Sequence, residues 1–313
     1  MTSRSTASTA AEHQELHAHS TLTTTTFDEN RNLLFGLVYN MLGTVTDTED
    51  VLQDTWLSWA SARHGEVANS RAYLVRIAVN RALRSLRAAK ANRETYVGTW
   101  LPEPVVTEDQ TEDSALRGES VSLAMMVVLE TLSPMERAVF VLREAFGYDY
   151  PEIANVLGRT CDSVRQLAHR ARKHVEGRRP RYQPDSKVVR AATERFLDAA
   201  LGADLGTLME ILAPEVQLWS DGGGKHRSAL RVIVGRDKCV RLADSLAKTF
   251  PPGLNTRYLE VNGTPAVLLS REHRPWVVTQ LDLRPSDGRI QRIYQIINPD
   301  KLTTMPLPDE LAP

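Results

Sequence analysis

Side chains that can bind nucleic acid are concentrated between residues 161 and 176. Guanidinium and ammonium groups bind phosphates, and Arg and Gln side chains can also contact base edges in the DNA major groove. At helical spacing, Val164, Leu167, Ala168 and Ala171 fall on one face. The opposite face collects the candidate DNA-binding residues Arg165, Gln166, His169, Arg170, Arg172 and Lys173. The segment therefore predicts an amphipathic helix whose polar face binds DNA.

The residues before this helix predict a partner helix and a tight corner. Pro151 and Glu152 suit the first turn of a helix, and Gly158 suits a left-handed residue at its end. Small Ala154 allows the two helices to approach closely. Together the segments predict a helix-turn-helix. An ordinary helical hairpin with a solvated basic face is the alternative, but the one-sided charge favours DNA binding.

A second basic surface is predicted upstream, between Arg71 and Arg93. This segment has the periodicity of a long helix and contains no acidic residue. A solvated helix face usually mixes both signs of charge, so phosphate binding explains a face of one sign better. The candidate DNA-binding residues here are Arg76, Asn80, Arg81, Arg84 and Arg87.

An acidic helix is expected before the second basic surface. Thr46 and Glu49 have the spacing of a capping box, which places the start of this helix at Thr46. Its polar side carries Asp47, Glu49, Asp50 and Asp54. Compensation of the helix dipole accounts for the first three carboxylates. Asp54 lies beyond the first turn, so a role in binding a partner stays open for it.

Composition limits the class of protein. The chain has 313 residues, enough for two or three domains, and a net charge of −1. Its two cysteines fit neither a disulfide framework nor a metal site. The Ser/Thr-rich start lacks the apolar core of a signal peptide, and the longest mainly apolar run, residues 121–129, is too short to cross a bilayer. We expect a soluble, cytoplasmic protein without a cofactor, a metal or a catalytic constellation.

The sequence predicts several domains. Residues 1–26 are low in complexity and are expected to be a disordered tail, and residues 27–98 form a first helical module. A linker over 99–119 contains the stiff, proline-bearing residues 100–104, and 120–182 hold the helix-turn-helix module. Residues 186–302 predict an α+β domain in which helices precede antiparallel strands of a curved sheet. Residues 303–313 form a Pro-rich tail.

Two further patterns in the α+β domain suggest ligand binding. Residues 222–225 invite comparison with a phosphate-binding loop, but Trp219 stands where the first glycine belongs and His226 follows the lysine. A tight turn is the better interpretation. A pocket for a small ligand, lined by polar and aromatic side chains of the sheet, stays open. Its candidate lining is His226, Arg271, His273, Trp276 and Tyr294.

The order of these segments resembles bacterial sigma factors of the extracytoplasmic-function group. The resemblance is carried by DTEDVLQDTWLSW (47–59), YLVRIAVNRALRSLR (73–87) and YPEIANVLGRTCDSVRQLAHRAR (150–172). WLPEP (100–104), DGGGK (221–225) and NPDKL (298–302) are similar to signature motifs of the subgroup with a fused SnoaL-like extension, which has a nuclear-transport-factor-two-like cone fold. These matches cover residues 27–302.

The resemblance implies a role for each segment. The acidic residues Asp47, Glu49, Asp50 and Asp54 would bind core RNA polymerase. The loop 64–70 and the basic helix would help to melt promoter DNA, and the helix-turn-helix would recognise a farther promoter element. The extension would regulate the sigma modules in cis through an interface that comprises Trp100, Leu101, Pro102, Glu103, Pro104, Asp221, Gly222, Gly223, Gly224, Lys225, Asn298, Pro299, Asp300, Lys301 and Leu302.

Two other classes of function remain open at this point. A conventional helix-turn-helix repressor or activator would bind DNA without acting through core polymerase. An enzyme on the SnoaL-like domain would need an acid or base in a pocket, and Asp221 is the best candidate for that group.

Overall fold

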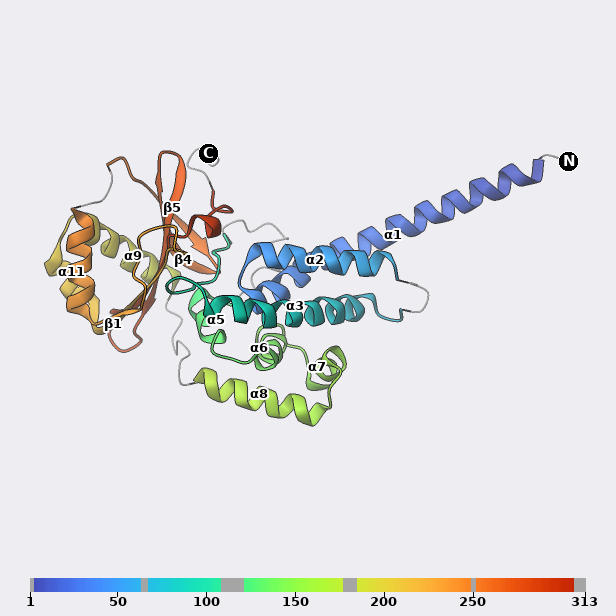
Figure 1. Cartoon of the computed structure of the whole chain (residues 1–313), viewed down its shortest axis with the longest axis horizontal. Helices are drawn as coiled ribbons and strands as arrows, with labels where there is room; N and C mark the ends of the chain where they lie inside the picture. Colours follow the sequence, from blue (N-terminus) through green and yellow to red (C-terminus); the bar gives the residue numbers. More distant parts are fainter. Residues whose placement is uncertain (1–2, 63–66, 108–120, 177–184, 249–251, 307–313) are drawn as a thin grey trace. The chain divides into compact units, whose positions relative to one another are not determined.

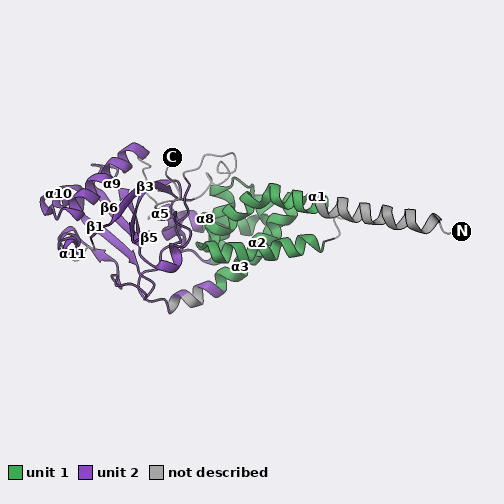
Figure 2. Ribbon diagram, turned by 90° about the horizontal axis from the view of Figure 1, so that it is seen from above, with its two compact units in different colours: residues 1–87, 134–170 green, residues 88–133, 171–313 purple. Residues whose placement is uncertain are grey.

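The computed structural model describes residues 3–62, 67–107, 121–176, 185–248 and 252–306. Side chains are described from residue 23 onward, except those of residues 90–92 and 94. The chain divides into two compact units: residues 1–87 with 134–170, and residues 88–133 with 171–313 (Figure 2). The predicted linker over 108–119, the junction at 177–184 and the tail beyond 306 lie outside the described residues.

The first unit is helical. Helices α1 (Ser3–Leu42), α2 (Val45–Ala60) and most of α3 (Ser70–Glu94) surround a core that includes Leu34, Leu37, Leu74 and Trp59 (Figure 1). The predicted disordered tail, residues 1–26, overlaps the first part of α1. The capping box predicted at Thr46 is wrong, because α2 begins earlier, at Val45, and its N-cap is Thr44.

The helix-turn-helix follows, and all of it up to Arg170 belongs to the same unit. Helix α6 (Pro134–Phe140) continues into a π-helical segment, Val141–Ala145, and then α7 (Tyr150–Leu157) and α8 (Cys161–Glu176) follow. Asp149 and Glu152 form a capping box at α7, and Gly158 ends it with φ 60° and ψ 44°, the left-handed conformation predicted from the sequence. Arg137 of α6 is fully buried and its Nε donates to the Asn40 carbonyl at the end of α1, 3.1 Å away.

The second unit contains a six-stranded sheet. Its strands are β1 (Leu212–Asp221), β2 (Ile233–Val234), β3 (Asn255–Val261), β4 (Thr264–Arg271), β5 (Arg274–Leu283) and β6 (Ile290–Ile296), in the order β2-β1-β6-β5-β4-β3. The expectation of antiparallel pairing fails at one place, because β1 and β6 run parallel. The helices of this unit are α5 (Leu123–Leu129), α9 (Ser186–Leu201), α10 (Leu205–Ile211) and α11 (Arg236–Ala247).

The two faces of the sheet pack against different parts of the chain. One face carries Val216, Leu281 and Ile293 and packs against α9, α10 and α11. The other face carries Leu268, Val278 and Ile296. Residues from outside the predicted α+β domain cover this second face, namely Leu101, Val106, Leu123, Ala124 and Val127, together with Leu302 and Met305. The linker and α5 therefore belong to the core of the second unit.

This architecture confirms the fold class predicted from the sequence, in which helical modules precede an α+β domain. Within the described ranges, no helix combines the length and the apolar character that a bilayer crossing needs.

Candidate nucleic-acid interface and buried polar cluster

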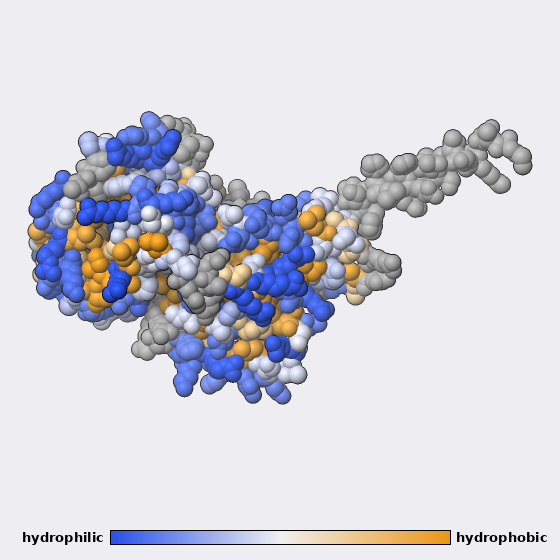
Figure 3. Space-filling view, viewed as in Figure 1, coloured by the Kyte–Doolittle hydropathy of each residue, from blue (hydrophilic) through white to orange (hydrophobic). Residues whose placement is uncertain are grey.

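The polar face of α8 is open to solvent. Arg165, Gln166, His169, Arg170 and Lys173 are exposed and Arg172 is half-buried. In the view of Figure 3, the outer edge of the molecule at the position of α8 is mainly hydrophilic. The buried face carries Val164 and Ala171, as the spacing predicts. All six candidate side chains thus lie on one helix, and five of them are exposed.

Two of these arginines pair with carboxylates. Arg165 Nη1 lies 3.0 Å from Asp162 Oδ1, and both side chains are exposed. Arg170 Nε lies 3.1 Å from Glu136 Oε1, a carboxylate whose side chain is only 10% exposed. Exposed ion pairs contribute roughly 0–1 kcal/mol, so phosphates can compete for Arg165 at little cost. Arg170 also positions α8 against α6.

The candidate residues on the predicted basic face of α3 differ more in exposure than those on α8. Arg76, Arg84 and Arg87 are exposed. Asn80 donates its amide to the carbonyls of Arg76 and Val156, at 2.7 and 3.0 Å, so it also joins α3 to α7. A surface cavity of about 510 Å³ lies beside these contacts, and its lining includes Asn69, Tyr73 and Glu152.

The acidic side of α2 contacts neighbouring basic residues. Glu49 pairs with Arg31 at 2.7 Å, and Asp54 pairs with Arg81 at 2.5 Å. Arg81 also donates to Ser58 Oγ. Asp50 is exposed and Asp47 accepts a hydrogen bond from the Thr44 hydroxyl. Asp54 and Arg81, predicted to bind different partners, are therefore bound to each other.

The three pentapeptides meet in the second unit around a buried carboxylate. Asp221 is fully buried, and its oxygens accept four hydrogen bonds. Oδ1 accepts from the Tyr96 hydroxyl at 2.6 Å and the Gly223 amide at 3.1 Å. Oδ2 accepts from the Leu101 amide at 2.8 Å and Lys301 Nζ at 2.7 Å. We call Tyr96, Leu101, Asp221, Asn298 and Lys301 the Asp221 cluster.

Lys301 completes the cluster from the other side of Leu101. Its Nζ donates to the Leu101 carbonyl at 2.5 Å as well as to Asp221. Its side chain is 8% exposed, and burial lowers the pKa of Lys301 while the Asp221 carboxylate opposes that shift. The same ammonium lies 4.3 Å from the ring centre of Trp100, which Arg93 covers at 3.7 Å. Both polar backbone groups of Leu101 are thus bound by charged side chains.

Asn298 and the glycines fix the geometry of the cluster. Asn298 donates its side-chain amide to the Tyr96 hydroxyl at 2.9 Å, and its backbone amide to the Asp221 carbonyl at 2.9 Å. Gly223 has φ 60°, and a Cβ there would lie within 2.3 Å of the Asn298 amide nitrogen. The close approach therefore requires glycine. At the surface, Lys225 pairs with Asp300 at 2.6 Å.

The linker beyond Leu101 extends the sheet. Pro102, Glu103 and Pro104 are buried. Val106 then forms an antiparallel bridge with Val261 of β3, at the edge of the sheet. The Thr107 amide donates to the Glu260 carbonyl at 2.9 Å, and the Asn262 amide to the Val105 carbonyl at 2.8 Å. The segment 100–107 is therefore held by side chains at its start and by strand-like pairing at its end.

The predicted ligand pocket is not assembled. Tyr294 packs on the sheet face that the linker covers, whereas Trp276 packs on the opposite face. His226, Arg271 and His273 are exposed. Tyr294 and Trp276 therefore lie on opposite faces of the sheet and do not line one pocket.

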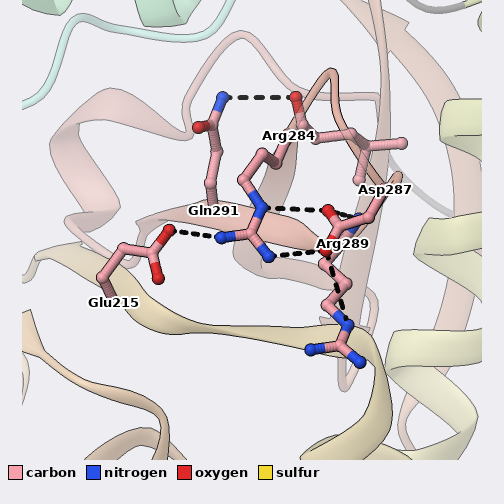
Figure 4. A network of polar contacts seen from close by, with 6 residues as sticks. Glu215, Arg284, Asp287, Arg289 and Gln291 are labelled. Carbon is pink, nitrogen blue, oxygen red and sulfur yellow. Dashed lines mark hydrogen bonds and ion pairs between the residues drawn. The ribbon is translucent and has the colours of Figure 1, made fainter.

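A separate polar network lies at the turn between β5 and β6 (Figure 4). Arg284 pairs with Asp287 at 2.5 Å and with Glu215 at 2.6 Å, and the Arg284 guanidinium lowers the pKa of Asp287 to about 2. These interactions fasten the turn to β1, because Arg284 pairs with Asp287 of the turn and with Glu215 of β1.

Comparison with known proteins decides the family. Residues 26–92 match Sigma-70 region 2, and residues 122–175 match Sigma-70, region 4. The ECF RNA polymerase sigma factor SigJ of Mycobacterium tuberculosis is 38% identical over 91% of this chain and 95% of its own length. The chain belongs to the extracytoplasmic-function sigma factors.

Two further similarities agree with membership of the extracytoplasmic-function sigma factors. The probable ECF sigma factor SigI of M. tuberculosis is 30% identical over 90% of this chain and 95% of its own length. The crystal structure of M. tuberculosis SigJ has a TM-score of 0.72 and 34% identity, covering 91% of this chain and 99% of that chain.

Family membership establishes the general function. Sigma factors recognise promoters with core RNA polymerase and are not enzymes, so the enzymatic alternative is set aside. The position of Asp221 agrees, because its oxygens already accept four hydrogen bonds within the protein.

Sequence reasoning did not identify Tyr96, a member of the Asp221 cluster, or Arg93, which covers the ring of Trp100. Both precede Trp100 closely, and Tyr96 stands in a short connection with Gly98. An aromatic residue in such a polar connection needs a packing partner. That signal could have drawn attention to Tyr96, but it could not have identified Asp221 as its acceptor.

Proposed function

We propose that this sigma factor is restrained in cis by its C-terminal α+β domain, which holds the chain between the two sigma regions. The single observation that carries the proposal is the binding of Leu101 by two motifs distant in sequence. Asp221 accepts from the Leu101 amide, and Lys301 donates to the Leu101 carbonyl. The pentapeptides at 221–225 and 298–302 thus contact one residue of the pentapeptide at 100–104.

The position of the bound linker in the chain explains how its contact with the α+β domain would restrain the sigma regions. Residues 96–107 lie between the matches to regions 2 and 4. Helix α5, at the start of the region 4 match, also packs on the sheet through Leu123 and Val127. A domain that holds both segments restricts the course of the chain between the two regions. Tethering makes such a contact effective even where its intrinsic affinity is low.

The promoter and polymerase contacts are part of the same proposal. Arg165, Gln166, His169, Arg170, Arg172 and Lys173 would contact promoter DNA from α8, and Arg76, Asn80, Arg81, Arg84 and Arg87 from α3. Asp47, Glu49, Asp50 and Asp54 would contact core polymerase. The exposure of most of these side chains supports their roles. Asn80 already donates its side-chain amide to the Val156 carbonyl, so contact of that amide with DNA would require this bond to break.

Transcription with purified core polymerase tests the restraint. A chain ending at residue 297 loses Lys301 and should initiate more transcripts than the full chain. The matched control ends at residue 306, so it keeps Leu302 and Met305 in the core and should behave like the full chain. A chain ending at residue 182 need not gain activity.

A point variant provides a second test. Lys301→Met cannot donate to the Leu101 carbonyl and also leaves Asp221 buried without its cation, so it should weaken the second unit, release the linker and raise transcription. Lys225→Met removes an exposed ammonium and serves as the control. Equal transcription by the full chain, the 297 truncation and Lys301→Met would refute restraint in cis.

A further inference from the structure

We propose that the α+β domain itself binds the phosphate backbone of duplex DNA, through a basic surface beside the edge strand β2. This surface consists of the loop before β2 and the first turns of α11. Its basic side chains, which we call the β2-edge cluster, are Arg227, Arg231, Lys238 and Arg241. The proposal depends on membership of the sigma factors and not on the proposed restraint.

The charge of this surface is almost entirely of one sign. Residues 225–241 contain six Lys and Arg residues and a single carboxylate, Asp237. The other carboxylate of α11, Asp244, pairs with Lys248 at 2.7 Å. A solvated surface usually mixes both signs of charge, whereas a surface of one sign is typical of phosphate binding. All four side chains of the β2-edge cluster are exposed.

The cluster also lacks the ion pairs that hold other arginines of the domain. Arg190, Arg195 and Arg284 each pair with a carboxylate of the same domain. Over the part of the chain that the structure describes, no member of the β2-edge cluster forms an ion pair. A phosphate that binds these side chains therefore displaces no carboxylate.

Close backbone contacts hold the loop half of the surface. The amides of Lys225 and His226 donate to the Gly222 carbonyl at 3.0 and 3.1 Å, which forms a tight turn. A Cβ at Gly222 would lie 2.4 Å from Ser228 Oγ, so the chain returns closely over this glycine. The backbone at Arg227 is therefore ordered before DNA binds, and binding loses no free energy to ordering of the loop.

The helical half follows directly across the sheet edge. Strand β2 lies at the end of the sheet, Arg231 comes just before it, and α11 begins at Arg236 just after it. Lys238 and Arg241 are three residues apart and so share one side of α11. An extended chain rises about 3.3 Å per residue, so Arg231 lies at most roughly 17 Å from Arg236. A surface of this length spans several phosphates of one strand, which recur about every 3.4 Å along the duplex axis.

The residue types identify duplex DNA as the partner. Residues 225–241 contain no Phe, Tyr or Trp. Protein interfaces depend on aromatic anchors, and single-stranded nucleic acid is bound by stacking of its bases on aromatic rings. Guanidinium and ammonium groups without such rings suit the phosphates of a duplex, which position a protein without specifying sequence. The sigma regions of the same chain raise the effective concentration of promoter DNA at the cluster.

Salt-dependent binding to DNA tests the proposal with the full chain. The probe is a fluorescein-labelled duplex of about 40 base pairs with random sequence, followed by fluorescence anisotropy between about 50 and 200 mM NaCl. Each phosphate contact contributes about 0.9 to the slope of log K against log salt. Arg227→Gln with Arg231→Gln should therefore lower the slope by about 2 and weaken binding at least about tenfold at the lowest salt. Lys238→Gln with Arg241→Gln should act in the same direction.

The matched control makes the same change of net charge elsewhere on the domain. Lys187→Gln with Arg274→Gln alters two exposed residues outside the β2-edge cluster. Its slope should equal that of the unaltered chain, because phosphates bound at the cluster do not contact either residue. Circular dichroism of every variant establishes that each is folded.

Photocrosslinking locates the contact without changing a charge. Leu230, in the loop between Arg227 and Arg231, is 67% exposed. A benzoylphenylalanine substituted for Leu230 should crosslink to the labelled duplex. The same substitution at Val188 of α9, which is 50% exposed, should not.

Three outcomes would overturn the proposal. The first is that the cluster variants and the control have equal salt slopes, and the second is that residue 230 crosslinks no more than residue 188. The third is an unchanged slope with DNA, together with lost binding to anionic phosphatidylglycerol vesicles or to core polymerase without DNA, which would assign the cluster to a membrane or a protein. The chain ending at residue 297 keeps the cluster, so its transcription tests the restraint in cis separately.

Discussion

The basic face of α8 and the Asp221 cluster use charge in opposite ways. On α8, Arg165 and Lys173 are exposed, and the ion pair between Arg165 and Asp162 lies in solvent. In the Asp221 cluster, the Asp221 carboxylate and the Lys301 ammonium are buried together. The carboxylate also accepts hydrogen bonds from the Tyr96 hydroxyl and the Leu101 amide. In the first arrangement the exposed groups are accessible to a partner molecule, whereas in the second the charged groups are already bound to each other within the chain.

This difference determines what a substitution should do in each region. An exposed charge contributes little to folding, so its loss is felt only when DNA or polymerase is bound. A buried charge without its partner destabilises the fold itself. Variants of the two regions should therefore separate into binding defects and folding defects.

The largest effect is expected at Asp221. Asp221→Ala leaves Lys301 buried without its carboxylate and should cost about 3–5 kcal/mol of unfolding free energy in the second unit. Urea denaturation measures this. Asp300→Ala breaks only the exposed pair with Lys225 and should cost at most about 1 kcal/mol. Equal losses in the two variants would contradict the contrast between buried and exposed charges.

On α8 the effect should appear in DNA binding. Arg165→Ala is expected to weaken promoter binding by about 1–3 kcal/mol if the guanidinium contacts a base, with little change in stability. A salt titration separates the alternatives, because loss of a phosphate contact lowers the salt slope by about 1. Arg190→Ala, on α9, is the control for an exposed arginine in an ion pair. If both variants bind the promoter equally well, the DNA-reading surface lies elsewhere.

The acidic helix should show a smaller effect on polymerase. Asp50→Lys reverses an exposed charge and should weaken core binding by up to about 1 kcal/mol, without unfolding the protein. Asp28→Lys makes the same change of charge on α1 and is the control. Asp54 is less suitable, because its reversal also disturbs Arg81. Unaltered affinity for core polymerase would leave dipole compensation as the explanation of these carboxylates.

The smallest effect concerns the surface turn at Asp287. Arg284 lowers the pKa of this carboxyl to about 2, so the pair stabilises the fold at neutral pH. Because the folded pKa lies below the ordinary value of about 3.9, this contribution falls as pH decreases from about 4 towards 2. Carbon NMR of the Asp287 carboxyl gives the pKa, and Arg284→Gln should return it towards its ordinary range. A carboxyl that titrates near 4 in both proteins would disprove the pairing.

The sequence predicted the elements better than their contacts. Periodicity identified α7, α8 and most strands, and Gly158 was assigned its left-handed conformation, because these features depend on neighbouring residues. The parallel pairing of β1 with β6 depends on residues far apart and was not foreseen. The same is true of Tyr96, whose acceptor Asp221 is distant in sequence.

The resemblance named the three pentapeptides that meet around Asp221, but it did not give the geometry of their contact. Nothing in WLPEP indicates that the backbone of Leu101, rather than a side chain, would be the group that Asp221 and Lys301 bind. Every residue has a backbone carbonyl, so the residue type at position 101 does not indicate which side chains bind its backbone groups. In contrast, the requirement for Gly223 is visible in the sequence and is explained by its contact with Asn298.

The packing of α5 and the linker on the sheet has a consequence for the solution behaviour of shortened chains. Leu101, Leu123 and Val127 are covered by Leu268 and Val278 of the α+β domain. Removing the whole domain at residue 182 would expose these apolar side chains to water together. Contiguous apolar surface of this kind promotes self-association. Such a chain should therefore elute from a size-exclusion column as oligomers, whereas the chain ending at residue 306 keeps the sheet together with Leu302 and Met305 and should elute as a single species.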